Sequence, residues 1–212
     1  LGTAELHRVA REGKEPRHRP AVPGHSDFAW HAARSLYAEE IEPALCLDMA
    51  VDHGVLSVLP LLDPPPWSVR IVPIAVNVVL EPMPTPRRCW KLGQALGRAI
   101  ASFPGEDRIA VVATGGLSHQ LHGPEFGFTN PEWDQRFLDL LETAPEQLAG
   151  ITHSELIERG GAESVEMMVW LAMRGALCGP APRRVQRHYN APMLTGYGLL
   201  ALEHGSPAAP HE

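Results

Sequence analysis

Two histidines occupy positions from which a side chain could exchange protons with a ligand. His119 lies in the stretch Thr114-Gly-Gly-Leu-Ser-His-Gln120, just after the apolar run 109–113, which we expect to form a buried strand. His53 lies in Val51-Asp-His-Gly54, after an expected strand over residues 44–49. Side chains just past strand ends in α/β proteins face the crevices where ligands bind, and imidazole carries protons near neutral pH. The two positions therefore suggest an acid/base pair.

Each histidine also has a purely structural interpretation. His119 could be a core histidine whose ring is satisfied by the backbone, and Asp52 could simply hydrogen-bond the ring of His53. His122 could join His119 in a metal pair if the stretch were helical, but Gly123-Pro124 argues against a helix. We expect the other histidines to be mostly solvated.

Glu166 is the third candidate. It lies in an expected helix over residues 163–177 and shares a three-and-four-spaced stripe with Val169, Trp170 and Met173. Such a stripe is expected to face the core. A buried carboxylate must be paired, neutralised or bound to a metal, because an isolated buried charge is costly. An ion pair with one of the arginines is the structural alternative.

Several common catalytic patterns are absent from the sequence. Ser118 has no surrounding G-x-S-x-G, and neither a phosphate loop nor a G-x-G-x-x-G stretch occurs. The three cysteines form no C-x-x-C pair, so neither a zinc knuckle nor a disulfide framework is indicated.

Composition limits the class of protein. The 212 residues are 44% hydrophobic and 20% charged, which fits a globular chain. A net charge of −7 gives no support for a nucleic-acid partner. We find no apolar run of the roughly 20 residues that a membrane span needs, and a reducing cytoplasm is the expected location.

Helices and strands are expected to alternate, which predicts an α/β fold with a mixed central sheet flanked by helices. The expected strands cover residues 44–49, 71–79, 109–113, 185–189 and 197–203. Expected helices begin at Ser26, about Arg88, Pro131 behind Asn130, and Thr152, where Thr152-His-Ser-Glu155 matches a capping box, with 163–177 as the last. We expect one catalytic domain over residues 1–204 and a disordered tail over 205–212.

Several stretches together resemble one known family, in consistent order and spacing. They are Val51-Asp-His-Gly54, Pro73-Ile-Ala-Val-Asn-Val-Val79, Arg87-Arg-Cys89, Gly115-Gly-Leu-Ser-His-Gln-Leu121, Trp133-Asp-x-x-Phe-Leu-Asp-Leu-Leu141 and Glu163-Ser-Val-Glu-Met-Met-Val-Trp170. They are similar to the class III extradiol ring-cleavage dioxygenases, in particular the protocatechuate 4,5-dioxygenase β subunits and the gallate dioxygenases. The resemblance spans most of residues 1–203.

The resemblance implies a non-haem Fe(II) site with two histidines and one carboxylate, which leaves one face open for substrate and O₂. Carried onto this chain, Glu166 would be the carboxylate ligand, His119 the base that deprotonates a catechol hydroxyl, and His53 the acid. The family's two histidine ligands would lie upstream of the segment that aligns with Leu1. The implied reaction opens the ring beside the diol to give a muconic semialdehyde.

The resemblance also bears on substrate and partners. The implied substrates are a small aromatic diol and O₂, and we expect a homo-oligomer or a complex with a small α-type subunit. Residues 193–196, Met-Leu-Thr-Gly, differ from the acid-contacting Ser-Asn of the protocatechuate enzymes, which argues against protocatechuate itself. The alternative is a non-catalytic homologue or scaffold subunit that lacks the two-histidine part of the iron site.

Overall fold

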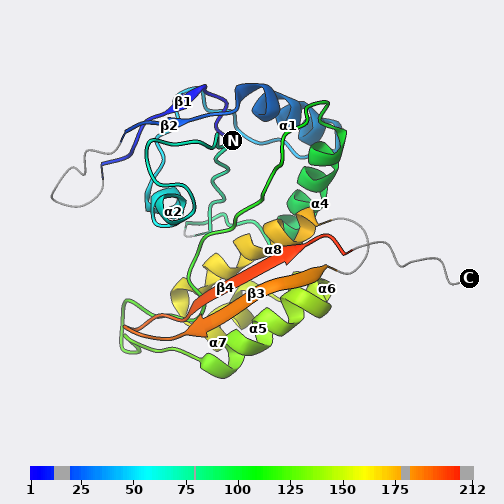
Figure 1. Ribbon diagram of the computed structural model, residues 1–212. Helices are drawn as coiled ribbons and strands as arrows, with labels where there is room; N and C mark the ends of the chain where they lie inside the picture. The colour runs from blue at the N-terminus through cyan, green and yellow to red at the C-terminus, as the bar shows by residue number, and fades with distance from the viewer. Residues whose placement is uncertain (12–19, 79, 178–181, 206–212) are drawn as a thin grey trace, which may run out of the picture. The chain divides into compact units, whose positions relative to one another are not determined.

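The computed structural model describes residues 1–11, 20–78, 80–177 and 182–205. They form two compact units, shown with their elements in Figure 1. The first unit comprises Leu1–Val76 and Ala99–Ile109, and the second comprises Asn77–Arg98 and Ala110–Glu212. The prediction of one domain over 1–204 stays a prediction, because a compact unit need not fold independently. Residues 206–212 of the predicted tail lie outside the described residues.

The first unit contains short elements and one longer helix. β1 (Leu6–His7) and β2 (Val22–Pro23) pair antiparallel, and α1 (Ser26–Ala38), α2 (His53–Leu56) and α3 (Leu59–Leu62) follow. The predicted helix at Ser26 is confirmed, although its cap is His25, whose Nδ1 accepts a hydrogen bond from the Phe28 amide at 3.4 Å. The apolar stripe of α1 is buried as its spacing predicts, and Phe28 packs edge-on against Phe103 with ring centroids 5.2 Å apart.

The segments at 44–49 and 71–78 do not form the predicted strands, and neither does 109–113. The first two make isolated bridges instead, Gly2 with Cys46 and Gly24 with Ile71, both parallel. Residues 44–49 are exposed or half-buried, and Pro73 has no amide hydrogen to extend a ladder. Position 79 lies outside the described residues. In the part of the chain that the structure describes, the expected central sheet is therefore replaced by two two-stranded sheets.

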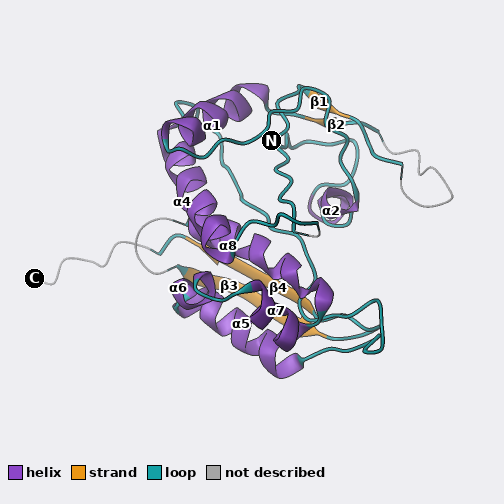
Figure 2. Cartoon of the chain, turned by 180° about the vertical axis from the view of Figure 1, so that it is seen from behind, coloured by secondary structure: helices purple, strands orange, loops and turns teal. Residues whose placement is uncertain are grey.

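The second unit packs helices on one face of a hairpin. β3 (Arg183–Asn190) and β4 (Tyr197–Glu203) pair antiparallel, which confirms both predicted closing strands. The helices lie behind the hairpin in Figure 1 and in front of it in the opposite view of Figure 2, so they cover one of its faces. The elements are α4 (Pro86–Ser102, whose last turn belongs to the first unit), α5 (Pro131–Thr143), α6 (Pro145–Ala149), α7 (His153–Gly160), the 3₁₀ helix η1 (Ala162–Glu166) and α8 (Met167–Ala176).

Two of the predicted helix starts of this unit are confirmed by their caps. The Asn130 side chain accepts from the Trp133 amide at 3.1 Å, with Pro131 at the first helical position of α5. Thr152 and Glu155 form the predicted capping box of α7. These local hydrogen bonds satisfy amides that the helix itself leaves free, so the sequence pattern alone predicts them.

The helix predicted over 163–177 divides at Glu166 into η1 and α8. The expectation that this stripe faces the core is only partly confirmed. Trp170 is buried, whereas Glu166, Val169 and Met173 are half-buried. Met167, Met168 and Leu171 are buried instead. An apolar stripe does not identify the core face of α8, because this helix is apolar and packed on most of its circumference.

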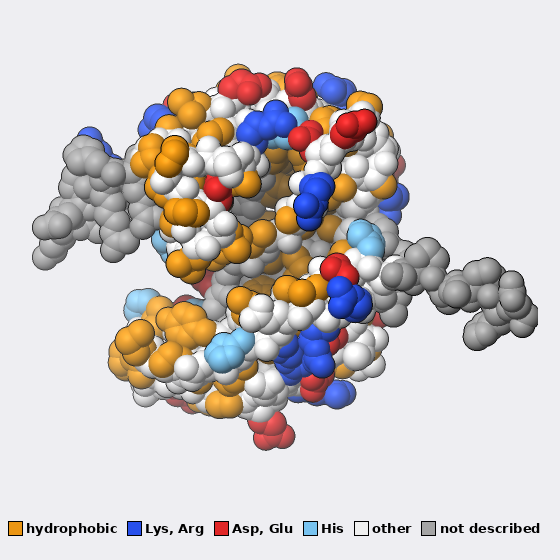
Figure 3. Space-filling view, viewed as in Figure 1, with side chains coloured by type: hydrophobic (Ala, Val, Ile, Leu, Met, Phe, Trp, Pro, Cys, Tyr) orange, Lys and Arg blue, Asp and Glu red, His pale blue; other side chains and the backbone are white. Residues whose placement is uncertain are grey.

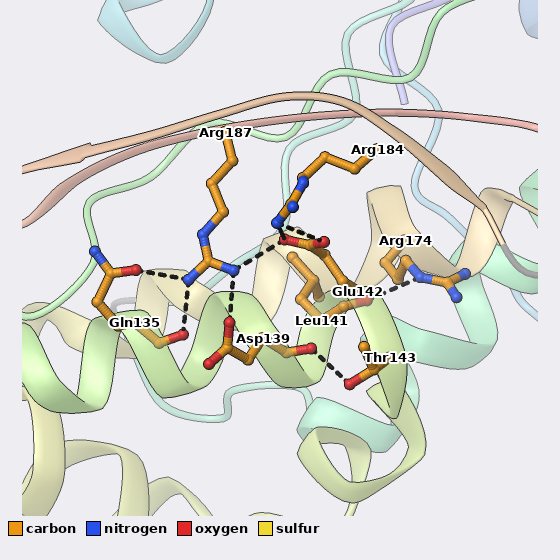
Figure 4. A network of polar contacts seen from close by, with 8 residues as sticks. All are labelled: Gln135, Asp139, Leu141, Glu142, Thr143, Arg174, Arg184 and Arg187. Carbon is orange, nitrogen blue, oxygen red and sulfur yellow. Dashed lines mark hydrogen bonds and ion pairs between the residues drawn. The ribbon is translucent and has the colours of Figure 1, made fainter.

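A polar network fixes the hairpin to α5 (Figure 4). The Arg187 guanidinium contacts Asp139 at 2.6 Å, Glu142 at 2.9 Å and the Gln135 side chain at 2.6 Å. Buried Arg174 donates to the Leu141 carbonyl at 2.9 Å.

Among the described residues, no helix is long and apolar enough to cross a membrane.

Candidate active site

Gly115 and Gly116 bring two of the predicted site residues to one turn of the second unit. The Gly116 amide donates to Glu166 Oε2 at 2.8 Å. A Cβ on Gly115, whose φ is +154°, would lie 3.0 Å from Glu166 Cβ, and one on Gly116 would lie 2.8 Å from His119 Cε1. Glycine is therefore needed for both side chains to approach the same backbone.

Glu166 keeps one carboxylate oxygen available. Oε2 accepts from Gly116, whereas Oε1 has no hydrogen-bond partner among the described residues. No lysine or arginine in that part of the chain pairs with it, so the ion-pair alternative is not found there. The Trp170 indole donates to the Gly115 carbonyl at 3.2 Å and holds the turn against α8. The free oxygen is suited to bind a cation.

The His119 ring has a defined tautomer. His119 is 6% exposed, and its Nδ1 lies 2.8 Å from the Leu117 carbonyl oxygen. Since a carbonyl only accepts, Nδ1 carries the hydrogen and Nε2 the lone pair. Nε2 has no partner among the residues that the structure describes. The core-histidine alternative thus accounts for Nδ1, while Nε2 remains available as a base.

The backbone of His119 is held from the side of α7. Its amide donates to the Gly160 carbonyl at 2.8 Å, and it forms an isolated antiparallel bridge with Thr195. At Gly161, φ is +90° and a Cβ would lie 2.3 Å from the His119 carbonyl oxygen. The start of η1 therefore fits only when position 161 is glycine.

A buried carboxylate that the sequence reasoning missed lies behind this turn. Asp134 Oδ1 accepts from the Ser118 amide at 2.8 Å, and Oδ2 accepts from the Ser118 hydroxyl at 2.7 Å and the Tyr189 hydroxyl at 2.8 Å. Burial raises the pKa of Asp134, although these hydrogen bonds oppose the rise. A signal was present, because Asp134 has Phe137, Leu138 and Leu141 at helical spacings on its own face of α5.

Glu163 ties the stretch after His119 to η1. Its carboxylate accepts from the Leu121 amide at 3.1 Å and lies 2.9 Å from His122 Nδ1. Burial raises the pKa of Glu163, but the hydrogen bonds from His122 and Leu121 outweigh it, so the net pKa is lowered. The His122 ring is exposed, and its Nδ1 contacts the Glu163 carboxylate and not His119.

His53 belongs to the first unit. It is the exposed first residue of α2, and the Asp52 carboxylate caps this helix by accepting from the Gly54 amide at 3.0 Å. His119 belongs to the second unit, and the pairing of His53 with His119 stays a prediction.

Among the described residues, Glu166 is the candidate for the carboxylate ligand of the expected iron site. No group of three His, Cys, Asp or Glu side chains among them could hold a metal ion. Glu166, with its free Oε1, has the donor chemistry of the carboxylate ligand. The resemblance implies that the two histidine ligands lie upstream of the segment that aligns with Leu1.

Apolar side chains gather at the loop end of the second unit (Figure 3). Met193 and Leu194 have φ of 51° and 69° and are 81% and 42% exposed. Leu121 and Phe126 are also exposed, and a Cβ on Gly127 would touch Leu194 at 3.0 Å. Because Thr195 bridges His119, this apolar surface adjoins the turn that carries His119.

Comparison with known proteins identifies the family of the chain. The family model described as the catalytic LigB subunit of aromatic ring-opening dioxygenase matches residues 1–199. The chain therefore belongs to this family and is homologous to extradiol ring-cleavage dioxygenases, which confirms the resemblance. Membership implies the family's fold, whereas the described residues show helices with two small sheets and not the expected mixed central sheet.

The names of individual relatives describe dioxygenases of hydroxylated aromatic compounds. The chain is 46% identical over 204 residues to gallate dioxygenase of Pseudomonas putida, covering 95% of this chain and 60% of that protein. It is 30% identical over 233 residues to 2,3-dihydroxyphenylpropionate/2,3-dihydroxicinnamic acid 1,2-dioxygenase of Paraburkholderia xenovorans, covering 89% and 72%. The chain thus spans about three fifths of the length of the gallate enzyme.

Proposed function

We propose that this protein is an Fe(II)-dependent extradiol dioxygenase that opens the ring of a catechol-type substrate, such as a gallate-like compound, beside its diol. The observation that carries the proposal is that Glu166 and His119 flank the same Gly115-Gly116 turn, each with a free ligand or base atom. Family membership supports the reaction class.

The side chains have distinct roles in the proposed reaction. Glu166 Oε1 would hold the metal. Fe(II), when bound, would supply the centre to which the diol binds as a chelate and at which O₂ is activated. His119 Nε2 takes the proton of a catechol hydroxyl, because its lone pair is available while Nδ1–H stays on the Leu117 carbonyl. His53 is the acid that returns a proton later in the reaction.

The apolar surface at Met193 and Leu194 bears on the substrate. The Met193 and Leu194 side chains carry no amide or hydroxyl group that could bind a carboxylate. A substrate substituent that reaches them is therefore uncharged, or its charge is held by other groups. Protocatechuate and gallate each carry a carboxylate, so both would need a partner for it outside these two side chains, and we compare both with catechol. We also propose that the protein is a homo-oligomer or pairs with a small α-type subunit.

The proposal is tested with the full-length protein, loaded anaerobically with Fe(II) and then given O₂ with catechol, protocatechuate or gallate. We expect O₂ uptake with formation of a ring-opened product from at least one of them. The Glu166→Ala variant should lose bound iron, measured by metal analysis, whereas Glu158→Ala, at an exposed position of α7, should retain it. A Glu166→Ala protein with full iron content would refute the ligand role, and an iron-free wild type would favour the non-catalytic alternative.

A further inference from the structure

One peptide group connects the His119 ring to a buried carboxylate. The Leu117 carbonyl accepts from His119 Nδ1 at 2.8 Å, and the Ser118 amide of the same peptide donates to Asp134 Oδ1 at 2.8 Å. Because a peptide is planar, with its C=O and N–H on opposite sides, fixing the N–H direction also fixes the carbonyl direction. Asp134 thus determines the orientation of the group that holds the His119 ring.

The environment of Asp134 is that of an acceptor-only carboxylate. The Asn130 amide donates to the Ser118 hydroxyl oxygen at 2.7 Å, so the hydroxyl hydrogen is directed to Asp134. The Tyr189 hydroxyl completes three donated hydrogen bonds to a carboxylate that is fully buried. No lysine, arginine or histidine among the described residues forms an ion pair with it. An unpaired buried carboxylate is costly, which argues for a role that outweighs this cost.

The backbone opposite Asp134 is packed to fit this arrangement. The Leu117 amide donates to the Gly196 carbonyl and the Gly196 amide to the Ser118 carbonyl, both at 2.9 Å. A Cβ on Gly196 would lie 2.1 Å from Asp134 Oδ2. The turn that carries His119 is therefore enclosed between the buried carboxylate and the segment leading into β4.

We propose that Asp134 is a positioning residue for His119 that acts through the Leu117–Ser118 peptide instead of contacting the ring. This inference rests on the proposed function only in taking His119 as the base. A carboxylate that accepts from one end of an amide polarises it and strengthens the carbonyl at the other end as an acceptor. The proton is thereby kept on Nδ1 and the lone pair on Nε2, as carboxylate partners do for histidine by direct contact elsewhere.

The test compares Asp134→Asn with Asp139→Asn in the full-length protein. Both variants replace an aspartate on α5 by its isosteric amide, but Asp139 is exposed and contacts Arg187. Ring ¹⁵N spectra of iron-free protein, with the His119 signals identified by their loss in His119→Gln, report the tautomer without catalysis. We expect wild type and Asp139→Asn to show the Nδ1–H form alone, and Asp134→Asn to show a mixture.

Kinetics of the iron-loaded proteins give the second readout. Asp134→Asn should lower kcat by about 10–100-fold with KM changed less than about threefold, since substrate still binds while the base is misplaced. If Asp134→Asn fails to fold, Tyr189→Phe removes one of the three hydrogen bonds to the carboxylate and should show a smaller change of both kinds. A single Nδ1–H tautomer in a folded Asp134→Asn or Tyr189→Phe variant would overturn the inference. An inactive wild type would count against the proposed function alone, because the tautomer measurement does not depend on turnover.

Discussion

At the scale of single residues, the chemistry of the candidate site depends on glycines as much as on the groups that react. Glu166 and His119 share a turn because Gly115 and Gly116 present no side chain to either. Residue type and spacing made both His119 and Glu166 candidates, and the family resemblance then gave each of them a role. The His119 tautomer and the contribution of Asp134 could not be predicted, since both depend on hydrogen bonds between residues that only the fold brings together.

Gly161 gives a direct test at this scale. Gly161→Ala must place a Cβ 2.3 Å from the His119 carbonyl oxygen with φ at +90°. We expect a loss of about 2–4 kcal/mol in the free energy of unfolding, measured in denaturant, together with reduced ring opening.

Gly150→Ala is the matched control for Gly161→Ala. Gly150 has φ of −88° at the end of α6, and an added Cβ would lie 3.5 Å or more from its neighbours. Its effect on stability should stay within about 1 kcal/mol. Equal stabilities of the two variants would show that the close packing of position 161 against His119 does not hold in solution.

At the scale of elements, most of the longer helices were predictable, whereas the short helices α2, α3 and α6 and most of the strands were not. Capping residues such as Asn130 and Thr152 act on their own helix ends, so a short stretch of sequence contains the whole signal. A strand needs a neighbour to pair with along its length, and residues 44–49 find only an isolated bridge at Cys46. The hairpin was predictable because β3 and β4 pair with each other.

The attachment of this hairpin to α5 can be tested at Arg187. Arg187→Ala leaves Glu142, whose side chain is 14% exposed, without its closest cationic contact and removes the ion pair with Asp139. We expect a loss of about 1–3 kcal/mol in the free energy of unfolding, because Glu142 is poorly solvated and keeps only its longer contact with Arg184.

Arg184→Ala removes the same charge from the same strand as a control. The Arg184 side chain is 53% exposed and reaches Glu142 at 3.3 Å, so its loss should cost at most about 1 kcal/mol. If urea unfolding showed Arg184→Ala to be the more damaging change, the network in Figure 4 would not be what holds the hairpin.

At the scale of the whole molecule, a single family model matches residues 1–199, which include parts of both compact units. The second unit contains Glu166 and His119, and the first contains His53. Sequence alone predicted the family, but neither the division into units nor the small extent of the sheets. Both depend on long-range pairing that local patterns do not encode.

The central claim is that Glu166 binds the metal while His119 acts as the base, and His119→Ala separates these roles most directly. In the full-length protein this variant should retain iron, because His119 is not a ligand in the proposed site. Ring opening of the best wild-type substrate should fall by about 10²–10⁴-fold, the usual contribution of a general base. His188→Ala, at an exposed position of β3, should leave both iron content and rate unchanged. An iron-loaded His119→Ala protein that opened catechols or gallate at nearly the wild-type rate would contradict the mechanism.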